Sequence, residues 1–230
     1  MYKTAAILAL TLLLHVHAWA QTHPKFYRTE AGKVYTQAQK DSIVQTGTPV
    51  GMLREEIIHD TAFALIEILR VEDFHAFVTR YKGQPLPALT FKTMTGETIR
   101  TADLKGKVVL LNFWSVTCGP CLKEMPELNR LQQAYAGKVI FLAPLPEDQA
   151  RTKKTLARHP FQFTVVPGSK AVFDTLGIDD YPKNFFVNRQ GIIQEVTEGT
   201  PMKRDAATGT WHLAVYQDYG RILDELLAQP

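Results

Sequence analysis

The chain has 230 residues, of which 45% are hydrophobic, 10% aromatic and 21% charged, a composition typical of a folded globular protein. This length suffices for one α/β domain with an appendage and is short for two large domains. The formal net charge of +3 is spread without a basic stripe, which argues against binding to nucleic acid or to an anionic membrane surface.

The first twenty residues are predicted to be a signal peptide. Met1–Lys3 provides a short positive start, an apolar run covers residues 5–14, and Ala18 and Ala20 place small side chains where a signal peptidase cuts. An uncleaved anchor is the alternative, but the apolar run is shorter than the ~20 residues that a membrane-spanning helix needs. We therefore expect cleavage after Ala20 and a soluble protein in the periplasm or another extracytoplasmic compartment, where disulfides persist.

Residues 21–83 are predicted to be an N-terminal extension, to which the sequence assigns no role. Short helices are expected over 36–44 and 72–81. Residues 52–71 mix apolar and charged side chains without a clear period, so both a hairpin and a helix fit them. The segment Gly83–Pro87 is rich in glycine and proline and is predicted to be the domain boundary.

Residues 84–230 alternate between strand and helix patterns. Strands are expected at 89–93, 98–100, 108–114, 139–143, 161–166, 184–188 and 192–197, and helices after Cys118 and at 147–159, 171–176 and 216–227. The apolar run 108–114 is broken only by Asn112, which is typical of a strand buried on both faces. A long loop is expected at 199–210. We predict an α/β fold with a mixed central sheet flanked by helices.

The chain has two cysteines, Cys118 and Cys121, at the start of a predicted helix. If Cys118 caps that helix and Cys121 lies in its first turn, their Cα atoms fall within the ~4.4–6.8 Å that a disulfide requires. The helix dipole would then favour a thiolate at Cys118, the species that attacks disulfides. Two other interpretations are an inert disulfide, which stabilises little across so short a loop, and a zinc site, for which further ligands at suitable spacing are lacking.

The segment from Asn112 to Leu128 resembles the active-site strand and helix of the TlpA/ResA branch of thioredoxin-like proteins. The resemblance covers residues 84–230 and does not cover 21–83. The residues that carry it are Asp103–Lys107, the motif Cys118-Gly119-Pro120-Cys121 and Tyr181-Pro182 ahead of Asn184–Val187. It implies a thioredoxin-like fold and a protein thiol–disulfide oxidoreductase whose redox centre is the Cys-Gly-Pro-Cys (CGPC) dithiol.

The same resemblance implies roles for individual residues. Cys118 and Cys121 would be catalytic, and Glu124, one helical turn after Cys121, would exchange a proton with its thiol. Tyr181-Pro182 would form a cis-proline loop that binds an extended segment of the substrate. Pro126 would remove one helical hydrogen bond and kink the helix.

Two positions depart from the family pattern. Asn112 stands where cytosolic thioredoxins carry a buried aspartate, which leaves Glu124 as the nearby candidate for proton transfer. Thr117 replaces the tryptophan usual before the first cysteine. The predicted substrate surface of Thr117, Tyr181 and Pro182 therefore lacks a flat aromatic wall, and the substrate preference stays open.

The expected reaction is attack of reduced Cys118 on a disulfide of an exported protein, followed by resolution by Cys121. This chemistry requires no cofactor and no metal. The resemblance favours cytochrome c maturation or the rescue of oxidised cysteines as the context, and it implies a membrane electron donor that reduces the chain again. The Gly-Pro pair is shared with thioredoxin, whose potential of about −270 mV favours the reducing direction.

Two alternatives to a disulfide reductase stay open. A disulfide oxidase or isomerase would use the same scaffold, and a non-catalytic binding module would use residues 21–83 or the 199–210 loop. A peroxidase is disfavoured because peroxide-reducing relatives place a threonine where this chain has Ser115. The sequence does not indicate the identity of the substrate or the oligomeric state.

Overall fold

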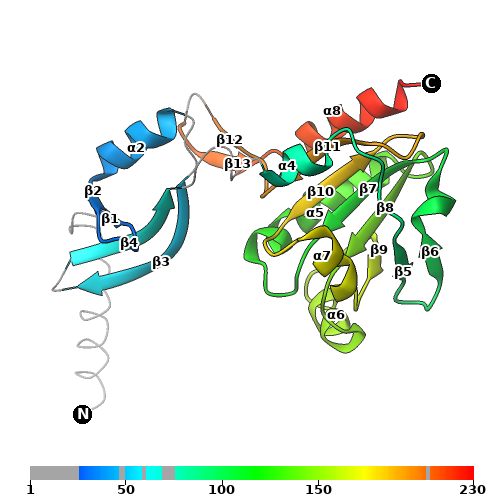
Figure 1. Ribbon diagram of the computed structural model, residues 1–230, viewed down its shortest axis with the longest axis horizontal. Coiled ribbons are helices and arrows are strands. Elements are labelled where there is room, and N and C mark those ends of the chain that lie inside the picture. Colours follow the sequence, from blue (N-terminus) through cyan, green and yellow to red (C-terminus); the bar gives the residue numbers. More distant parts are fainter. Residues whose placement is uncertain (1–25, 47–49, 59–60, 69–75, 206–207) are drawn as a thin grey trace, which may run out of the picture. The chain divides into compact units, whose positions relative to one another are not determined.

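The computed structural model describes residues 26–46, 50–58, 61–68, 76–205 and 208–230 (Figure 1). The chain divides into two compact units, residues 1–77 and 78–230. The predicted signal peptide lies outside the described residues.

The division between the units falls inside helix α4 (Ala76–Tyr81), ahead of the boundary predicted at Gly83–Pro87. Tyr81 belongs to the second unit because its hydroxyl donates a hydrogen bond of 2.7 Å to the carbonyl of Leu176. Its ring also packs against Phe185, with 5.0 Å between the ring centroids. These contacts join the end of α4 to the larger unit.

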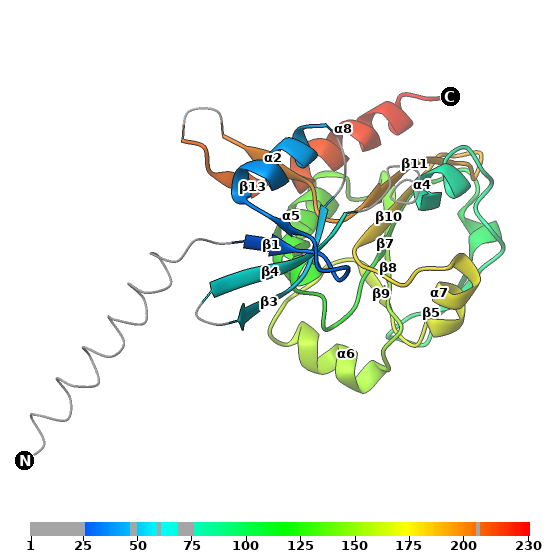
Figure 2. The same ribbon diagram turned by 60° about the vertical axis from the view of Figure 1, so that its left-hand side comes forward.

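The N-terminal unit is a four-stranded sheet with a helix. Its elements are β1 (Phe26–Arg28), β2 (Val34–Tyr35), α2 (Gln37–Gln45), β3 (Val50–Ile58) and β4 (Thr61–Ile68). The strand order is β2-β1-β4-β3, in which β1 and β4 are parallel and β3 and β4 antiparallel. Figure 2 shows α2 beside β1. Tyr27, Ala64 and Ile66 form the small buried core.

Sequence patterns identified one helix of this unit and left its strands open. The helix predicted at 36–44 is α2, which begins at a capping box formed by Thr36 and Gln39. The region without a clear period forms the antiparallel strands β3 and β4. Of the second predicted helix, 72–81, the described part is α4, and the preceding residues lie outside the description.

The C-terminal unit is an α/β domain. Its elements are β5 (Thr90–Lys92), β6 (Thr98–Arg100), the 3₁₀ helix η1 (Thr101–Leu104), β7 (Val108–Phe113), α5 (Gly119–Ala134), β8 (Val139–Pro144), α6 (Gln149–Leu156), β9 (Thr164–Val166), α7 (Lys170–Leu176), β10 (Lys183–Val187), β11 (Ile193–Glu198), β12 (Met202–Arg204), β13 (Trp211–Leu213) and α8 (Val215–Leu227). The central sheet has the order β11-β10-β7-β8-β9. Strands β7, β8 and β9 are parallel, whereas β10 and β11 run antiparallel to their neighbours, which confirms the mixed sheet.

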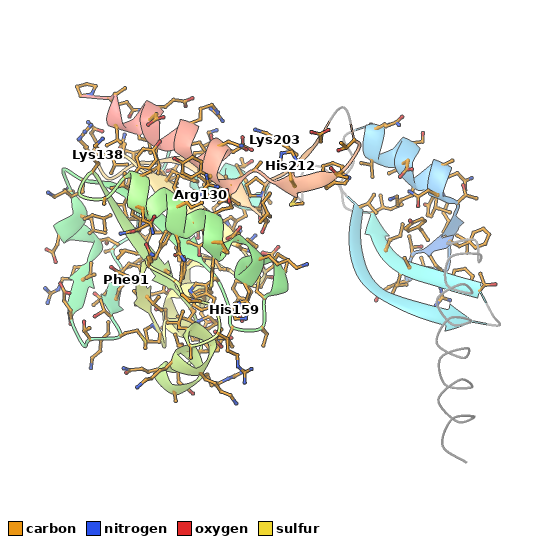
Figure 3. All side chains as sticks on the ribbon, turned by 180° about the vertical axis from the view of Figure 1, so that it is seen from behind. Phe91, Arg130, Lys138, His159, Lys203 and His212 are labelled. Carbon is orange, nitrogen blue, oxygen red and sulfur yellow. A yellow bond between two sulfur atoms is a disulfide. The ribbon has the colours of Figure 1, made fainter. Side chains whose placement is uncertain are left out.

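Every residue of β7 is buried, because helices cover the central sheet on both faces. Helices α5 and α8 lie side by side on one face (Figure 3). Val108, Leu110 and Trp114 belong to the large core that includes residues of these helices. On the other face, the ring of Phe113 meets Phe173 of α7 at 5.6 Å between centroids. The central strand is therefore held firmly up to the point where the chain enters the cysteine motif.

The segment predicted as a loop, 199–210, contains strand β12, so that prediction was wrong in part. Met202 pairs with Leu213 and Lys203 with His212, and the two strands form a hairpin between β11 and α8 (Lys203 and His212 are labelled in Figure 3). The hairpin is too short for its alternation of apolar and polar residues to stand out in the sequence. Its base is closed by a hydrogen bond of 2.9 Å from the amide of Ala214 to the carbonyl of Pro201.

Candidate active site

The two cysteines form a disulfide at the first turn of α5. Cys118 is the N-cap residue of the helix, as predicted, and the Cα atoms of Cys118 and Cys121 are 5.3 Å apart. The amide of Cys121 donates a hydrogen bond of 3.1 Å to the Sγ of Cys118. Cys118 is partly exposed, whereas Cys121 is 1% exposed. A partner can therefore reach Cys118, and the helix N-terminus favours its thiolate.

Glu124 lies on the same buried side of α5 as Cys121 and is 0% exposed. Its Oε1 accepts a hydrogen bond of 3.2 Å from the Nδ2 of Asn112 on β7. Its Oε2 makes no hydrogen bond within the described part of the chain, and neither does the nearby hydroxyl of Thr200. Burial raises the pKa of Glu124 from 4.5 to about 7, against the opposing influence of Thr200 and Asn112. The carboxyl is thus poised to gain or lose a proton near neutral pH.

A chain of buried polar side chains continues from Glu124 through the sheet. The Nδ2 of Asn112 also donates to the Oδ1 of Asn184 at 2.8 Å. The side-chain Nδ2 of Asn184 in turn donates to the hydroxyls of Tyr219 at 2.9 Å and Thr197 at 3.1 Å. Burial, and then the charge of Glu124, raises the pKa of the Tyr219 hydroxyl. Asn112 therefore has a structural role in its apolar strand. Through Asn184 it links the carboxyl of Glu124 on α5 to β10 and α8.

The peptide bond between Tyr181 and Pro182 is cis, as predicted. Strand β10 begins at the next residue and runs antiparallel to β7, with Lys183 opposite Phe113. The loop before β10 and the cysteine motif after β7 therefore lie at the same edge of the sheet. Pro182 is buried and its carbonyl accepts a hydrogen bond of 2.8 Å from the amide of Gly199. Within the described residues, the backbone of Tyr181 makes no hydrogen bond, which leaves it available to a partner.

Thr117 is exposed directly before Cys118 and belongs to a small polar cluster. The hydroxyl of Ser115 lies 3.0 Å from that of Thr117 and donates to the Oε1 of Glu147 at 2.6 Å. Burial, followed by the charge of Glu147, raises the pKa of the Tyr181 hydroxyl. Glu147 thus contacts the segment that carries Thr117, and its charge reaches the hydroxyl of Tyr181.

The described residues contain no group of three or more histidine, cysteine or acidic side chains placed to hold a metal ion. In the same part of the chain, no helix has the length and apolar character to cross a membrane.

Comparison with known proteins identifies the family. The model of the AhpC/TSA family matches residues 82–196, which is half of the chain. The chain belongs to the AhpC/TSA family. The thioredoxin-like protein YneN of Bacillus subtilis is 31% identical to this AhpC/TSA chain over 128 residues, which cover 54% of the chain and 75% of YneN. The thiol–disulfide oxidoreductase ResA of Bacillus thuringiensis is 31% identical over 124 residues, or 53% of the chain and 72% of ResA.

Solved structures agree with this assignment of the AhpC/TSA chain. A Chlorobium tepidum protein described as thiol:disulfide interchange protein DsbE superposes with a TM-score of 0.54 at 25% identity, covering 64% of the chain and 98% of its own length. The fold is thioredoxin-like, and the resemblance to ResA-type proteins is confirmed. Family, relatives and the disulfide at the helix N-terminus together establish a thiol–disulfide oxidoreductase.

The structure brings the predicted residues to one edge of the central sheet. Cys118, Cys121 and Glu124 share the first turns of α5, and Thr117 precedes them. Tyr181 and Pro182 enter from the neighbouring strand. Pro126 lies inside α5, and the predicted kink there stays a prediction.

Sequence reasoning missed several polar residues at this edge. They are Ser115, Glu147, Asn184, Thr200 and Tyr219. Asn184 had a usable signal, because it is a polar residue in an apolar strand, as Asn112 is. Ser115, Glu147 and Thr200 lie in loops and Tyr219 lies in α8, and the sequence does not display the tertiary contacts that bring them to this edge.

Proposed function

We propose that this chain reduces disulfides of exported proteins, with Cys118 as the attacking group. The Cys118 thiolate attacks one sulfur of the partner's disulfide, and the other sulfur leaves as a thiolate that takes up a proton. Cys121, once deprotonated, then attacks the Sγ of Cys118, and the second partner sulfur leaves. The partner gains two electrons and two protons, and the chain ends with its disulfide closed.

Glu124 is proposed to handle the proton of Cys121. A pKa of about 7 allows the carboxylate to accept the thiol proton of Cys121 and to return it when the chain is reduced again. The hydrogen bond from Asn112 holds the carboxyl on the Cys121 side of the helix. Glu124 is buried, so this exchange is protected from bulk water.

The substrate is proposed to bind across Thr117 and the cis-proline loop. Thr117 is exposed beside Cys118, and the backbone of Tyr181 has free hydrogen-bonding groups at the same edge of the sheet. An extended peptide around the target disulfide can pair with those groups. This surface selects proteins in preference to small disulfides.

The reducing direction and the location belong to the same proposal. The Gly119-Pro120 pair between the cysteines is the one found in thioredoxin, whose potential is about −270 mV. The signal-peptide pattern of residues 1–20 supports export. In an oxidising compartment the chain then needs a membrane electron donor. The names of the relatives support disulfide interchange, and cytochrome c maturation is the proposed context.

The observation that carries the proposal is the asymmetric disulfide, with Cys118 partly exposed at a helix N-terminus and Cys121 buried near Glu124. The test is cleavage of insulin disulfides by the full chain with dithiothreitol as the reductant. We expect the chain to accelerate cleavage and Cys118→Ser to return the rate to the dithiothreitol background.

The matched control is Lys138→Ala, because Lys138 is exposed beyond the far end of α5 (Figure 3). It should keep the wild-type rate. Equal rates for the wild type and Cys118→Ser would contradict the proposal and favour a binding module that does not use the cysteines.

A further inference from the structure

We propose that Lys183 is a positioning residue that holds the cis-proline loop in its substrate-binding form. The inference rests on the proposed function, because it concerns how the substrate surface is built. Lys183 directly follows Pro182 and is the first residue of β10. Its side chain is 5% exposed, which is unusual for a lysine.

The ammonium group of Lys183 binds carboxylates from two directions. Its Nζ lies 2.5 Å from the Oδ1 of Asp180, which precedes the loop and is largely exposed. It also forms an ion pair with the Oε1 of Glu198 at the end of β11. Burial lowers the pKa of Lys183, but the hydrogen bonds to Asp180 and Glu198 outweigh burial and raise it, so the lysine stays charged.

These ion pairs bracket the loop. Asp180 lies before Tyr181-Pro182 and Lys183 lies after it, so the first pair closes the loop on itself. Glu198 is followed by Gly199, whose amide donates the 2.8 Å hydrogen bond to the carbonyl of Pro182. The loop is thereby tied to β11 twice, once through the side chain of Lys183 and once through the backbone.

Glu198 depends on this arrangement. Its Oε2 is buried and makes no hydrogen bond within the described residues. A buried ion pair is weak support for stability, because removing two charges from water offsets most of their attraction. Apolar residues at both 183 and 198 would cost the fold little, so the charged pair is better explained by the loop geometry that it imposes.

The consequence concerns protein substrates more than small ones. A peptide that pairs with the Tyr181 backbone needs the loop in one place, and a displacement of about 1 Å in a positioned group can cost up to about a hundredfold in rate. A small disulfide such as hydroxyethyl disulfide meets only Cys118. Loss of Lys183 should therefore change the ratio between the two activities.

The test compares Lys183→Met with Lys183→Arg on reduced protein, with insulin and hydroxyethyl disulfide as substrates. For Lys183→Met we expect the ratio of the single-turnover rate constant with insulin to that with hydroxyethyl disulfide to fall about tenfold. The reduction potential should stay at the wild-type value. Lys183→Arg keeps the charge and should restore most of the ratio.

Two further variants control for the loss of an ion pair elsewhere on β11 and for the charge left unpaired at Glu198. Lys82→Met removes the Lys82–Glu195 ion pair, which also ends on β11 but lies away from the loop, and should leave the ratio unchanged. The double variant Lys183→Met with Glu198→Gln removes the uncompensated buried charge. It should still show the lowered ratio, and it replaces the single variant if that one fails to fold.

An unchanged ratio in the methionine variants would overturn the inference. So would a parallel fall in both activities with a shifted potential, because Lys183 would then act on the disulfide or on the fold as a whole. If the wild type reduced neither substrate, the proposed function would fail, and the positioning role would fall with it.

Discussion

Replacement of Cys121 with serine is expected to trap the chain on its substrate as a mixed disulfide. The partly exposed Cys118 can still attack, but the serine hydroxyl at position 121 cannot displace the partner sulfur. Reduced Cys121→Ser mixed with insulin should give a covalent adduct of the chain with an insulin chain. Non-reducing electrophoresis and mass spectrometry measure its yield and its lifetime.

The reciprocal variant is the control. Cys118→Ser leaves Cys121, which is 1% exposed and should form little adduct under the same conditions. A higher adduct yield from Cys118→Ser than from Cys121→Ser would reverse the roles assigned to the two cysteines. The pattern expected here also excludes the inert disulfide considered from the sequence, because a structural bridge would trap no partner.

Replacement of Glu124 with glutamine is expected to change the free energy of unfolding by an amount that depends on pH. The carboxyl has a pKa of about 7 in the folded, oxidised protein against 4.5 ordinarily, so the folded state holds the proton more tightly. The contribution of the protonated carboxyl to the free energy of unfolding is complete below pH 4.5 and is lost as the pH rises to 7. Above pH 7 the buried charge costs about 3 kcal/mol. Glu124→Gln should therefore raise the free energy of unfolding at pH 8 by about that amount, and by little at pH 4.

Urea unfolding of the oxidised protein at both pH values measures this difference. The matched control is Glu127→Gln on the same helix, where the carboxyl forms a surface ion pair with Arg130. It should show no comparable gain at pH 8. An equal effect of Glu124→Gln at pH 4 and pH 8 would contradict the assigned protonation.

The same variant should be more stable and less active. If Glu124 moves the proton of Cys121, Glu124→Gln should lower kcat/KM for insulin reduction about a hundredfold and remove the dependence on pH near 7. A rate and a pH profile equal to those of the wild type would leave Glu124 without a role in proton transfer.

The part of this account that the sequence predicted rests on local patterns. Buried β7, the capping cysteine and the first turn of α5 are encoded in consecutive residues, so spacing alone placed Cys118 and Cys121 correctly. The cis bond at Pro182 followed from a family resemblance and is present. Glu124, which the resemblance placed one helical turn after Cys121, is buried.

The remaining features depend on residues that are distant in the chain. The contact of Asn112 with Asn184 exists because β7 and β10 pair in one register, and a shift of one residue would separate them. Lys183 meets Glu198 for the same reason. The strands of the N-terminal unit likewise show too little alternation of apolar and polar residues to be recognised in the sequence. Their pairing with each other identifies them as strands.

The equilibrium reduction potential of the Cys118–Cys121 pair tests the central claim most directly. The full chain is equilibrated in thiol–disulfide buffers, and the reduced fraction is counted by alkylation and mass spectrometry. We predict a potential at or below about −230 mV, within the range of thioredoxin-like reductants. A potential above about −180 mV would contradict the reducing direction and would assign the chain to disulfide oxidation or isomerisation.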